Sequence, residues 1–488
     1  MQAPDLVPII PEIILLVAAC IVLLVEPFLK EDKTAVIAIA LTGLVASGAV
    51  ALALVGQDRV SFGGMLVLND YAVYFKVLFA AAGALTVLMS PGYLHALKRH
   101  LGEFYALLLF AVVGMDLMAA SRDLIPFYVA LELMAVSSYL LAAFFRYRAR
   151  SNESSLKYFL TGSFASAIML YGISLVYGVT GSTNYTAVAQ VLARGGNHAG
   201  IVFAVALFAI GLAFKVSAAP FHMWVPDVYQ GAPTPVAAFF SVGPKAAAFA
   251  VIVATFSTAF PSIAADWSVL FLALSVITIV VGNVFALVQT NVKRMLAYSS
   301  IAHAGYLLAG VAALGWGKGQ SGSYAGQAVL IYLAAYTFMN LGAFGILAYL
   351  KTQMPDRFDY SLKAMAGLGR RSPWAAVLLS LFLFSLTGIP GTAGFIGKFY
   401  VFGSVVHAGL IWLAVVGVLM SAVSAFYYLR VIMYMFFREP EEDFVVKEPI
   451  SGGMAAALAV SAIATLVIGL VPAWLWDAVV RAFGNLFS

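Results

Sequence analysis

Charged residues are scarce in this sequence. Of its 488 residues, 63% are hydrophobic and only 10% are charged, whereas about 25% of the residues in a typical soluble domain are charged. A soluble chain of this length would usually divide into several domains, each with a polar surface. The charged residues are too few to coat such surfaces, so the composition predicts that most of the chain is surrounded by lipid.

Cysteine is nearly absent as well. Cys20 is the only one, which excludes a disulfide framework and a cysteine-based metal or iron–sulfur site. The six histidines are scattered without paired ligand spacing, so no metal site is expected. Also missing are a P-loop, a glycine-rich dinucleotide motif and a basic stripe typical of nucleic-acid binding. The sequence therefore predicts no cofactor in this chain, no ATP-driven step and no nucleic-acid partner.

Long apolar runs are abundant instead. A membrane-spanning helix needs about 20 mostly apolar residues, and these runs are too long and continuous for the strands of a membrane barrel. The fold class expected is an all-α integral membrane protein. The fourteen expected spans are residues 7–26, 34–55, 70–90, 103–120, 123–144, 156–179, 199–220, 233–257, 267–288, 294–314, 326–350, 373–408, 410–437 and 452–485.

The basic residues of the loops predict the orientation. With the N-terminus placed outside, most loop lysines and arginines fall inside, as the positive-inside rule requires. The loop around Arg146, Arg148 and Arg150 is an example. An even number of spans then returns the C-terminus to the outside. We therefore expect a multi-pass membrane protein with both termini on the outer side.

Four charged residues fall well inside predicted spans. They are Glu132, Lys215, Lys245 and Lys398. A charge at the bilayer centre costs about 2.5–3.5 kcal/mol on insertion scales, so such residues are rarely accidental. Burial disfavours the ammonium form of lysine and a nearby carboxylate favours it. A glutamate whose distance from a lysine changes can therefore switch that lysine between binding and releasing a proton, which points to proton transport.

Other charged residues in or beside the spans give weaker evidence for proton transport than these four. Lys76, near a span end, is expected to form a fixed ion pair or to reach the interface with its long side chain. For Arg430 the functional and structural interpretations are evenly balanced, because arginine does not deprotonate. Asp116 is expected to anchor its span at the membrane interface, and Asp227 to cap or brace a helix break.

Two spans contain helix-breaking sequences. The seventh runs into APFHMWVPD at residues 219–227, with Pro220, and the twelfth contains TGIPGTAGF at residues 387–395, with Pro390. Proline removes a helix hydrogen bond and glycine loosens the backbone. Interrupted spans in corresponding places indicate a transport path. His222 at the first break, and Tyr298 and His303 on the tenth span, are candidates to link the two breaks, although a lone histidine is more often structural.

The corresponding breaks predict an internal repeat. Spans 4–8 and 9–13 are expected to be two five-span units, and an odd number of spans inverts the second unit against the first. The expected division is residues 1–102 for the first three spans, 103–257 and 258–437 for the two repeats, and 438–488 for a loop and the last span.

Several motifs resemble a known family. Residues 214–222 (FKVSAAPFH) and 226–235 (PDVYQGAPTP) form a specific block, and residues 131–134 (LELM), 294–303 (RMLAYSSIAH) and 394–399 (GFIGKF) agree with it. Together they resemble the antiporter-like membrane subunits of bacterial proton-translocating NADH–quinone oxidoreductase (complex I), and the PDVYQGAP wording resembles the subunit N branch. The resemblance covers essentially the whole chain.

The resemblance implies a proton relay through Glu132, Lys215, Lys245 and Lys398. It also implies that NADH, FMN, the iron–sulfur clusters and quinone are bound by partner subunits of the membrane and peripheral arms. The main alternative is a subunit of a multi-subunit sodium–proton antiporter. A purely structural membrane subunit and a solute carrier are weaker alternatives, because neither explains the row of intramembrane charges.

Overall fold

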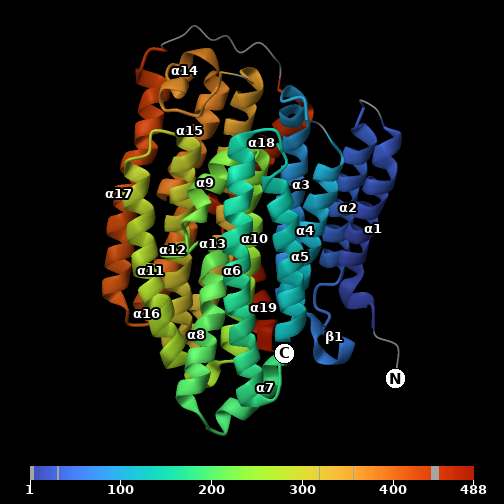
Figure 1. Ribbon diagram of the computed structural model, residues 1–488. Coiled ribbons are helices and arrows are strands. Elements are labelled where there is room, and N and C mark those ends of the chain that lie inside the picture. The colour runs from blue at the N-terminus through green and yellow to red at the C-terminus, as the bar shows by residue number, and fades with distance from the viewer. Residues whose placement is uncertain are drawn as a thin grey trace.

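The computed structural model describes residues 5–29, 32–99, 101–317, 319–355, 357–440 and 450–487. In these residues the chain forms a bundle of long helices aligned along one axis (Figure 1). Thirteen helical stretches are long and apolar enough to cross a membrane. The remaining predicted span, 373–408, is present as two shorter helices separated by a break. The prediction of an all-α membrane protein with about fourteen spans is therefore confirmed.

The N-terminal helices form one flank of the bundle (Figure 1). A short antiparallel hairpin, which pairs Val60 with Val67, separates the second helix from the third. The third helix begins where the side chain of Asn69 accepts a hydrogen bond from the backbone N–H of Ala72, a typical N-cap. The elements are α1 (Ile10–Val25), α2 (Thr34–Ala53), β1 (Arg59–Ser61), β2 (Leu66–Leu68) and α3 (Asp70–Ala96).

The next segment contains the first broken span. Asp123 and Asn184 cap the helices that follow them by accepting backbone N–H groups. The seventh span ends as a helix at Lys215 and resumes at Trp224. The elements are α4 (Glu103–Ala120), α5 (Leu124–Ala142), α6 (Ala149–Thr180), α7 (Tyr185–Ala193), α8 (His198–Lys215), α9 (Trp224–Gly231) and α10 (Thr234–Thr258).

The C-terminal part contains the second broken span. Here the helix ends at Thr387 and resumes at Ala393, with Gly388 at φ 94° and Gly391 at φ 85° between the halves. Only glycine adopts such angles without strain. The elements are α11 (Ala264–Leu287), α12 (Val292–Trp316), α13 (Gln320–Gln353), α14 (Leu368–Arg371), α15 (Pro373–Thr387), α16 (Ala393–His407), α17 (Ile411–Phe437), α18 (Gly452–Leu470) and α19 (Ala473–Gly484).

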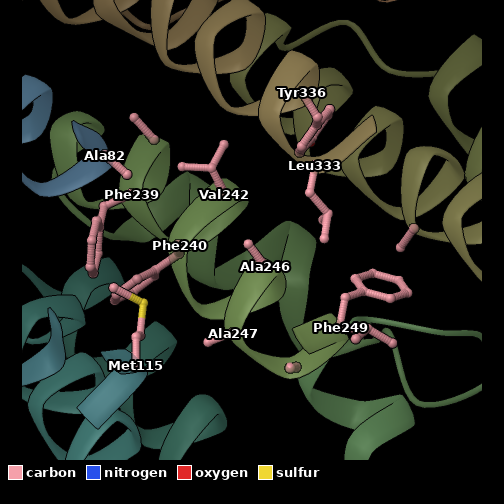
Figure 2. Close-up of a cluster of buried hydrophobic side chains, with 14 of the residues drawn as sticks. Ala82, Met115, Phe239, Phe240, Val242, Ala246, Ala247, Phe249, Leu333 and Tyr336 are labelled. Atoms are coloured by element: carbon pink, nitrogen blue, oxygen red, sulfur yellow. The ribbon is translucent and has the colours of Figure 1, made fainter. Parts of the chain in front are cut away.

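The centre of the bundle is helix α10. The most apolar stretch of α10 is completely buried, whereas only 33% of the corresponding stretch is buried in α2 and in α17. Figure 2 shows side chains of α3, α4 and α13, among them Ala82, Met115 and Leu333, around those of α10. The outer helices expose large apolar side chains such as Phe164 and Phe437. A polar side chain on α10 is therefore shielded from lipid by the surrounding helices.

The start of α1 and the end of α19 lie toward the same end of the bundle, in the lower half of Figure 1. This placement agrees with the predicted even number of spans. Part of the C-terminal loop expected within 438–488, residues 441–449, lies outside the described residues.

Candidate functional site

The first pair of predicted site residues meets between α5 and α8. Glu132 and Tyr139 lie two turns apart on one face of α5. Lys215, the last residue of α8, is 4% exposed, and its Nζ lies 3.5 Å from the Tyr139 hydroxyl. The Glu132 carboxylate interacts electrostatically with this ammonium group. The structure thus places Lys215 against α5, where its polar contact is a tyrosine on the helix face that also carries Glu132.

The break after Lys215 is held by specific backbone contacts. Ser217 has a left-handed φ of 66°, and the N–H of Ala218 donates to the carbonyl of Ala213. The N–H of Ala219 donates to the Thr278 hydroxyl of α11 at 2.9 Å. The break therefore joins the first broken span to α11, in the second predicted repeat. It also ends α8 beside the lysine.

The second half of this span is fixed by ion pairs. Asp227 on α9 binds Arg294 of α12 at 2.7 Å and Lys157 of α6 at 2.8 Å. The expected bracing role of Asp227 thus has a structural basis.

Lys245 lies at the centre of the bundle on α10. It is 3% exposed, and its Nζ donates to the carbonyl oxygen of Ser300 at 2.9 Å and to the Ser300 hydroxyl. Ser300 belongs to α12, so this lysine connects the two predicted repeats. Between Lys215 and Lys245 lie the rings of Phe214, Trp224 and Tyr229. Proton movement across this aromatic stretch requires water molecules or side-chain motion.

His303 on α12 forms the next polar cluster. Its Nδ1 is 2.6 Å from the Tyr332 hydroxyl and its Nε2 is 3.4 Å from the Tyr428 hydroxyl, which also bonds Ser299. Its ring lies 5.7 Å from that of Tyr306, over which Lys398 lies, and Lys245 binds Ser300 about one turn earlier on α12. The histidine is therefore placed between the two lysines and carries hydrogen-bond partners on both ring nitrogens.

Lys398 lies at the second break. It is 5% exposed, and its Nζ donates to the carbonyl oxygens of Leu386 at 3.0 Å and Thr387 at 2.8 Å. The hydroxyl of Ser421 on α17 is a third partner at 2.7 Å. The last carbonyls of a helix have no partner within the helix and attract a cation. The break in α15–α16 thus creates the binding site of this lysine.

The other predicted residues are not brought into this row. Tyr298 stacks on Phe285 of α11, with ring centroids 5.7 Å apart. His222 is half-buried at the first break, and Pro220 and Pro390 are exposed at the breaks. Arg430 donates to the carbonyl of Gln289 just beyond the end of α11, 2.5 Å away, which favours its structural interpretation.

Several residues of the site carry little signal in the sequence. Tyr139 could have been found from its spacing of seven residues from Glu132, which places both on one helix face. The remaining partners come from other helices, so no local spacing reveals them. They are Ser300, Tyr332, Ser421 and Tyr428.

A separate buried charge cluster lies among the N-terminal helices. Lys76 on α3 is fully buried and binds Glu12 of α1 at 2.9 Å and the carbonyl of Pro8 at 2.7 Å. Lys76 therefore forms an ion pair and does not extend to the interface. Asp116 is also fully buried, and among the described residues its carboxylate has no hydrogen-bond partner. The expectation that Asp116 anchors the membrane interface is wrong, because α1 and α3 cover this end of α4.

No group of three or more histidine, cysteine or acidic side chains placed to hold a metal ion occurs among the described residues. The polar groups around the lysine row are carbonyl oxygens, hydroxyls and one imidazole. This set suits the binding and transfer of protons.

Comparisons with known proteins find relatives over nearly the whole chain. The family described as "NADH:quinone oxidoreductase/Mrp antiporter, TM" matches residues 121–424. The chain is 46% identical to NADH-quinone oxidoreductase subunit N of Trichlorobacter lovleyi, over 96% of this chain and 95% of the relative. It is 43% identical to subunit N 1 of Solibacter usitatus, over 99% and 98%.

Solved structures show the same fold. A chain of respiratory complex I from Thermus thermophilus matches with a TM-score of 0.80 at 34% identity, over 96% of this chain and 99% of that one. A chain of the Mrp complex from Dietzia sp. matches with a TM-score of 0.86 at 21% identity, over 99% and 97%; at that identity the likeness concerns the fold alone. The chain therefore belongs to the NADH:quinone oxidoreductase/Mrp antiporter transmembrane family and, within it, to the subunit N family of NADH-quinone oxidoreductases.

Proposed function

We propose that this chain carries protons through the membrane arm of NADH–quinone oxidoreductase along Glu132, Lys215, Lys245, His303 and Lys398. Electron transfer from NADH to quinone takes place in partner subunits, which hold the flavin and iron–sulfur clusters. Redox events there change the charge state of the row. Similarity to subunit N proteins over nearly the whole chain supports the assignment to this complex.

One observation carries the proton-transfer proposal. Among the described residues, none of the three central lysines forms a salt bridge, whereas Lys76 pairs with Glu12. A lysine held by a carboxylate keeps its proton, because losing it would leave a buried negative charge. A lysine held by hydroxyls and carbonyls lacks this restraint. The row is therefore suited to reversible protonation, while the Glu12–Lys76 pair is suited to a fixed structural role.

The surroundings of Glu132 support the proposal that a neighbouring subunit acts on the proton row through this residue. It is half-buried in a stripe of α5 that otherwise exposes apolar side chains, among them Val129, Val136 and Leu140. One oxygen of its carboxylate is buried without a hydrogen-bond partner among the described residues, and a carboxylate at the lipid boundary is costly. A partner subunit over this stripe would remove that cost and could alter the interaction of Glu132 with Lys215.

The packing supports two inverted repeats, residues 103–257 and 258–437. In the first, α4 packs on α5 and α10, and α6 packs on α8. In the second, α11 packs on α12 and α17, and α13 packs on α15 and α16. Each repeat contains one broken span with a lysine at or near the break. Each could then open a half-channel to one side, with Lys245 and His303 between the halves.

The proposed location is the bacterial inner membrane, with both termini on the periplasmic side. The clustering of basic residues in the loops at the opposite end supports this orientation. A reporter fused after residue 488 tests it. With alkaline phosphatase as the reporter, activity in the periplasm is expected. A full-length fusion without this activity would contradict the predicted orientation.

The assignment is tested by purifying the tagged chain from gently solubilised membranes and assaying NADH–quinone reductase activity. Flavin and iron–sulfur subunits are expected to co-purify with activity. The variants Glu132→Ala and Lys215→Ala are then compared in proton pumping, with Arg59→Ala, which alters an exposed ion pair away from the row, as the control. Full pumping by both site variants would contradict the relay. Co-purification with membrane antiporter subunits alone would instead favour the sodium–proton antiporter alternative.

A further inference from the structure

A strongly basic cavity lies at the end of the bundle opposite to the termini. It has a volume of about 270 Å³ and lies where the α5–α6, α9–α10 and α11–α12 connections meet the end of α13. A single water molecule needs only about 10–15 Å³ of such space. The charged side chains that line it among the described residues are Arg148, Arg150, Lys293, Lys351, Arg357 and Asp359.

Two buried lysines form part of the wall of this cavity. Lys293 is 1% exposed and donates to the carbonyl of Ala232 at 2.7 Å. Lys351 is 8% exposed and donates to the carbonyl of Phe358 at 2.7 Å. Both ammonium groups lie over the ring of Tyr360, at 5.2 and 5.7 Å from its centroid. The two cations therefore approach one another from α12 and α13 in fixed positions.

The rim is basic as well. Arg148 directly precedes α6, Arg150 lies in its first turn, and both side chains are exposed. The positive charges of Arg148 and Lys351 both act on Lys293 unfavourably. Among the described lining residues Asp359 is the only acidic side chain. The cavity thus concentrates positive charge that an anionic ligand would offset.

The donors match a phosphate group in particular. Arginine guanidinium groups bind phosphate oxygens through paired N–H donors, and lysine supplies a compact charge. Basic pockets between helices on the cytoplasmic side of membrane proteins bind phosphorylated lipid headgroups. A cavity of this charge repels protons and metal cations, so it does not suit the intake of the protons carried by the row.

We propose that this cavity binds a phosphate-bearing anion through Arg148, Arg150, Lys293 and Lys351. The phosphate comes either from the headgroup of an anionic phospholipid or from a soluble phosphate. Lys293 also holds Ala232, the residue directly after α9. A bound phosphate therefore links the second half of the first broken span to α12 and α13.

The test uses the intact, purified complex. The double variant Arg148→Gln/Arg150→Gln changes only exposed rim residues. Its control is Arg146→Gln, which alters an exposed arginine of the same loop that does not line the cavity. After detergent exchange, each complex is placed in phosphatidylcholine nanodiscs containing phosphatidylglycerol, and retained phosphatidylglycerol is measured by native mass spectrometry. Binding of inorganic phosphate is measured in parallel by calorimetry.

Retention of phosphatidylglycerol by the unmodified complex and the Arg146 control, with roughly tenfold weaker binding in the double variant, would support a lipid site. The same pattern for inorganic phosphate alone would support a soluble ligand. Equal binding by all three complexes, or no binding of either probe, would overturn the proposal. Electron transfer and proton pumping are separate readouts, so this result is independent of the proposed relay.

Discussion

The ammonium group of Lys398 lies 2.8 Å from the carbonyl oxygen of Thr387, the residue at which helix α15 ends. The lysine sits on α16, so the two halves of the broken span meet through this contact. An unbroken helix would use the Thr387 carbonyl for its own next turn. The break thus supplies the acceptor for the lysine, which pairs with no carboxylate in the described part of the chain.

Replacing Lys398 with methionine is expected to lower proton translocation at least about tenfold, equivalent to roughly 1.4 kcal/mol in the barrier. The variant should still assemble, although the Leu386 carbonyl loses the ammonium group and the Thr387 carbonyl keeps only the Ser421 hydroxyl. Lys398→Arg is the informative companion, because arginine can bind the carbonyls but does not release its proton. Pumping is measured in vesicles alongside assembly on native gels. Normal pumping by the arginine variant would show that Lys398 acts only as a structural cation.

Replacing Gly162 with alanine should disturb the first lysine from a distance. A Cβ at Gly162 on α6 would clash with the Tyr139 hydroxyl, which must then shift and disturb its contact with Lys215. We expect a several-fold loss of proton pumping with normal assembly. Gly178→Ala on the same helix is the control, because a Cβ there meets nothing within 4 Å. Equal pumping by the two variants would mean that proton transfer through Lys215 does not depend on its contact with Tyr139.

Replacing Tyr332 with phenylalanine removes the 2.6 Å contact with His303 and keeps the ring. The expected cost in stability is small, about 0.5–1.5 kcal/mol, while proton transfer between Lys245 and Lys398 should slow. Tyr400→Phe is the control, because Tyr400 stacks on Trp476 away from His303. The measurement is the ratio of pumped protons to oxidised NADH. An unchanged ratio and rate in Tyr332→Phe would argue against His303 as a link.

The Glu12–Lys76 pair should respond differently from the row. Glu12→Ala leaves a fully buried ammonium group without its carboxylate, and breaking a buried pair costs about 3–5 kcal/mol. The purified complex should therefore melt at a lower temperature. The double variant Glu12→Met/Lys76→Met should recover most of the loss and pump normally. A double variant that is stable but fails to pump would assign this pair to proton transfer.

Much of this architecture follows from the sequence alone. Hydrocarbon cannot hydrogen-bond the backbone, so each long apolar run must form a helix, and proline and glycine mark the two breaks. The cost of intramembrane charge identifies Glu132, Lys215, Lys245 and Lys398 from their positions within the apolar runs. The groups that contact the three lysines could not be found in this way, because each lies on another helix than the lysine it contacts.

Helix rotation and packing were decided only in three dimensions. Tyr298, Ser299 and Ser300 are consecutive on α12, yet Tyr298 stacks on Phe285, Ser299 bonds Tyr428 and Ser300 binds Lys245. Successive residues of a helix point in directions about 100° apart, and in a helix buried on almost all sides the hydrophobic pattern does not show which direction faces which neighbour. Composition and spacing therefore determined the spans, the breaks and the buried charges. Only the packing of distant helices decided which polar groups those charges contact.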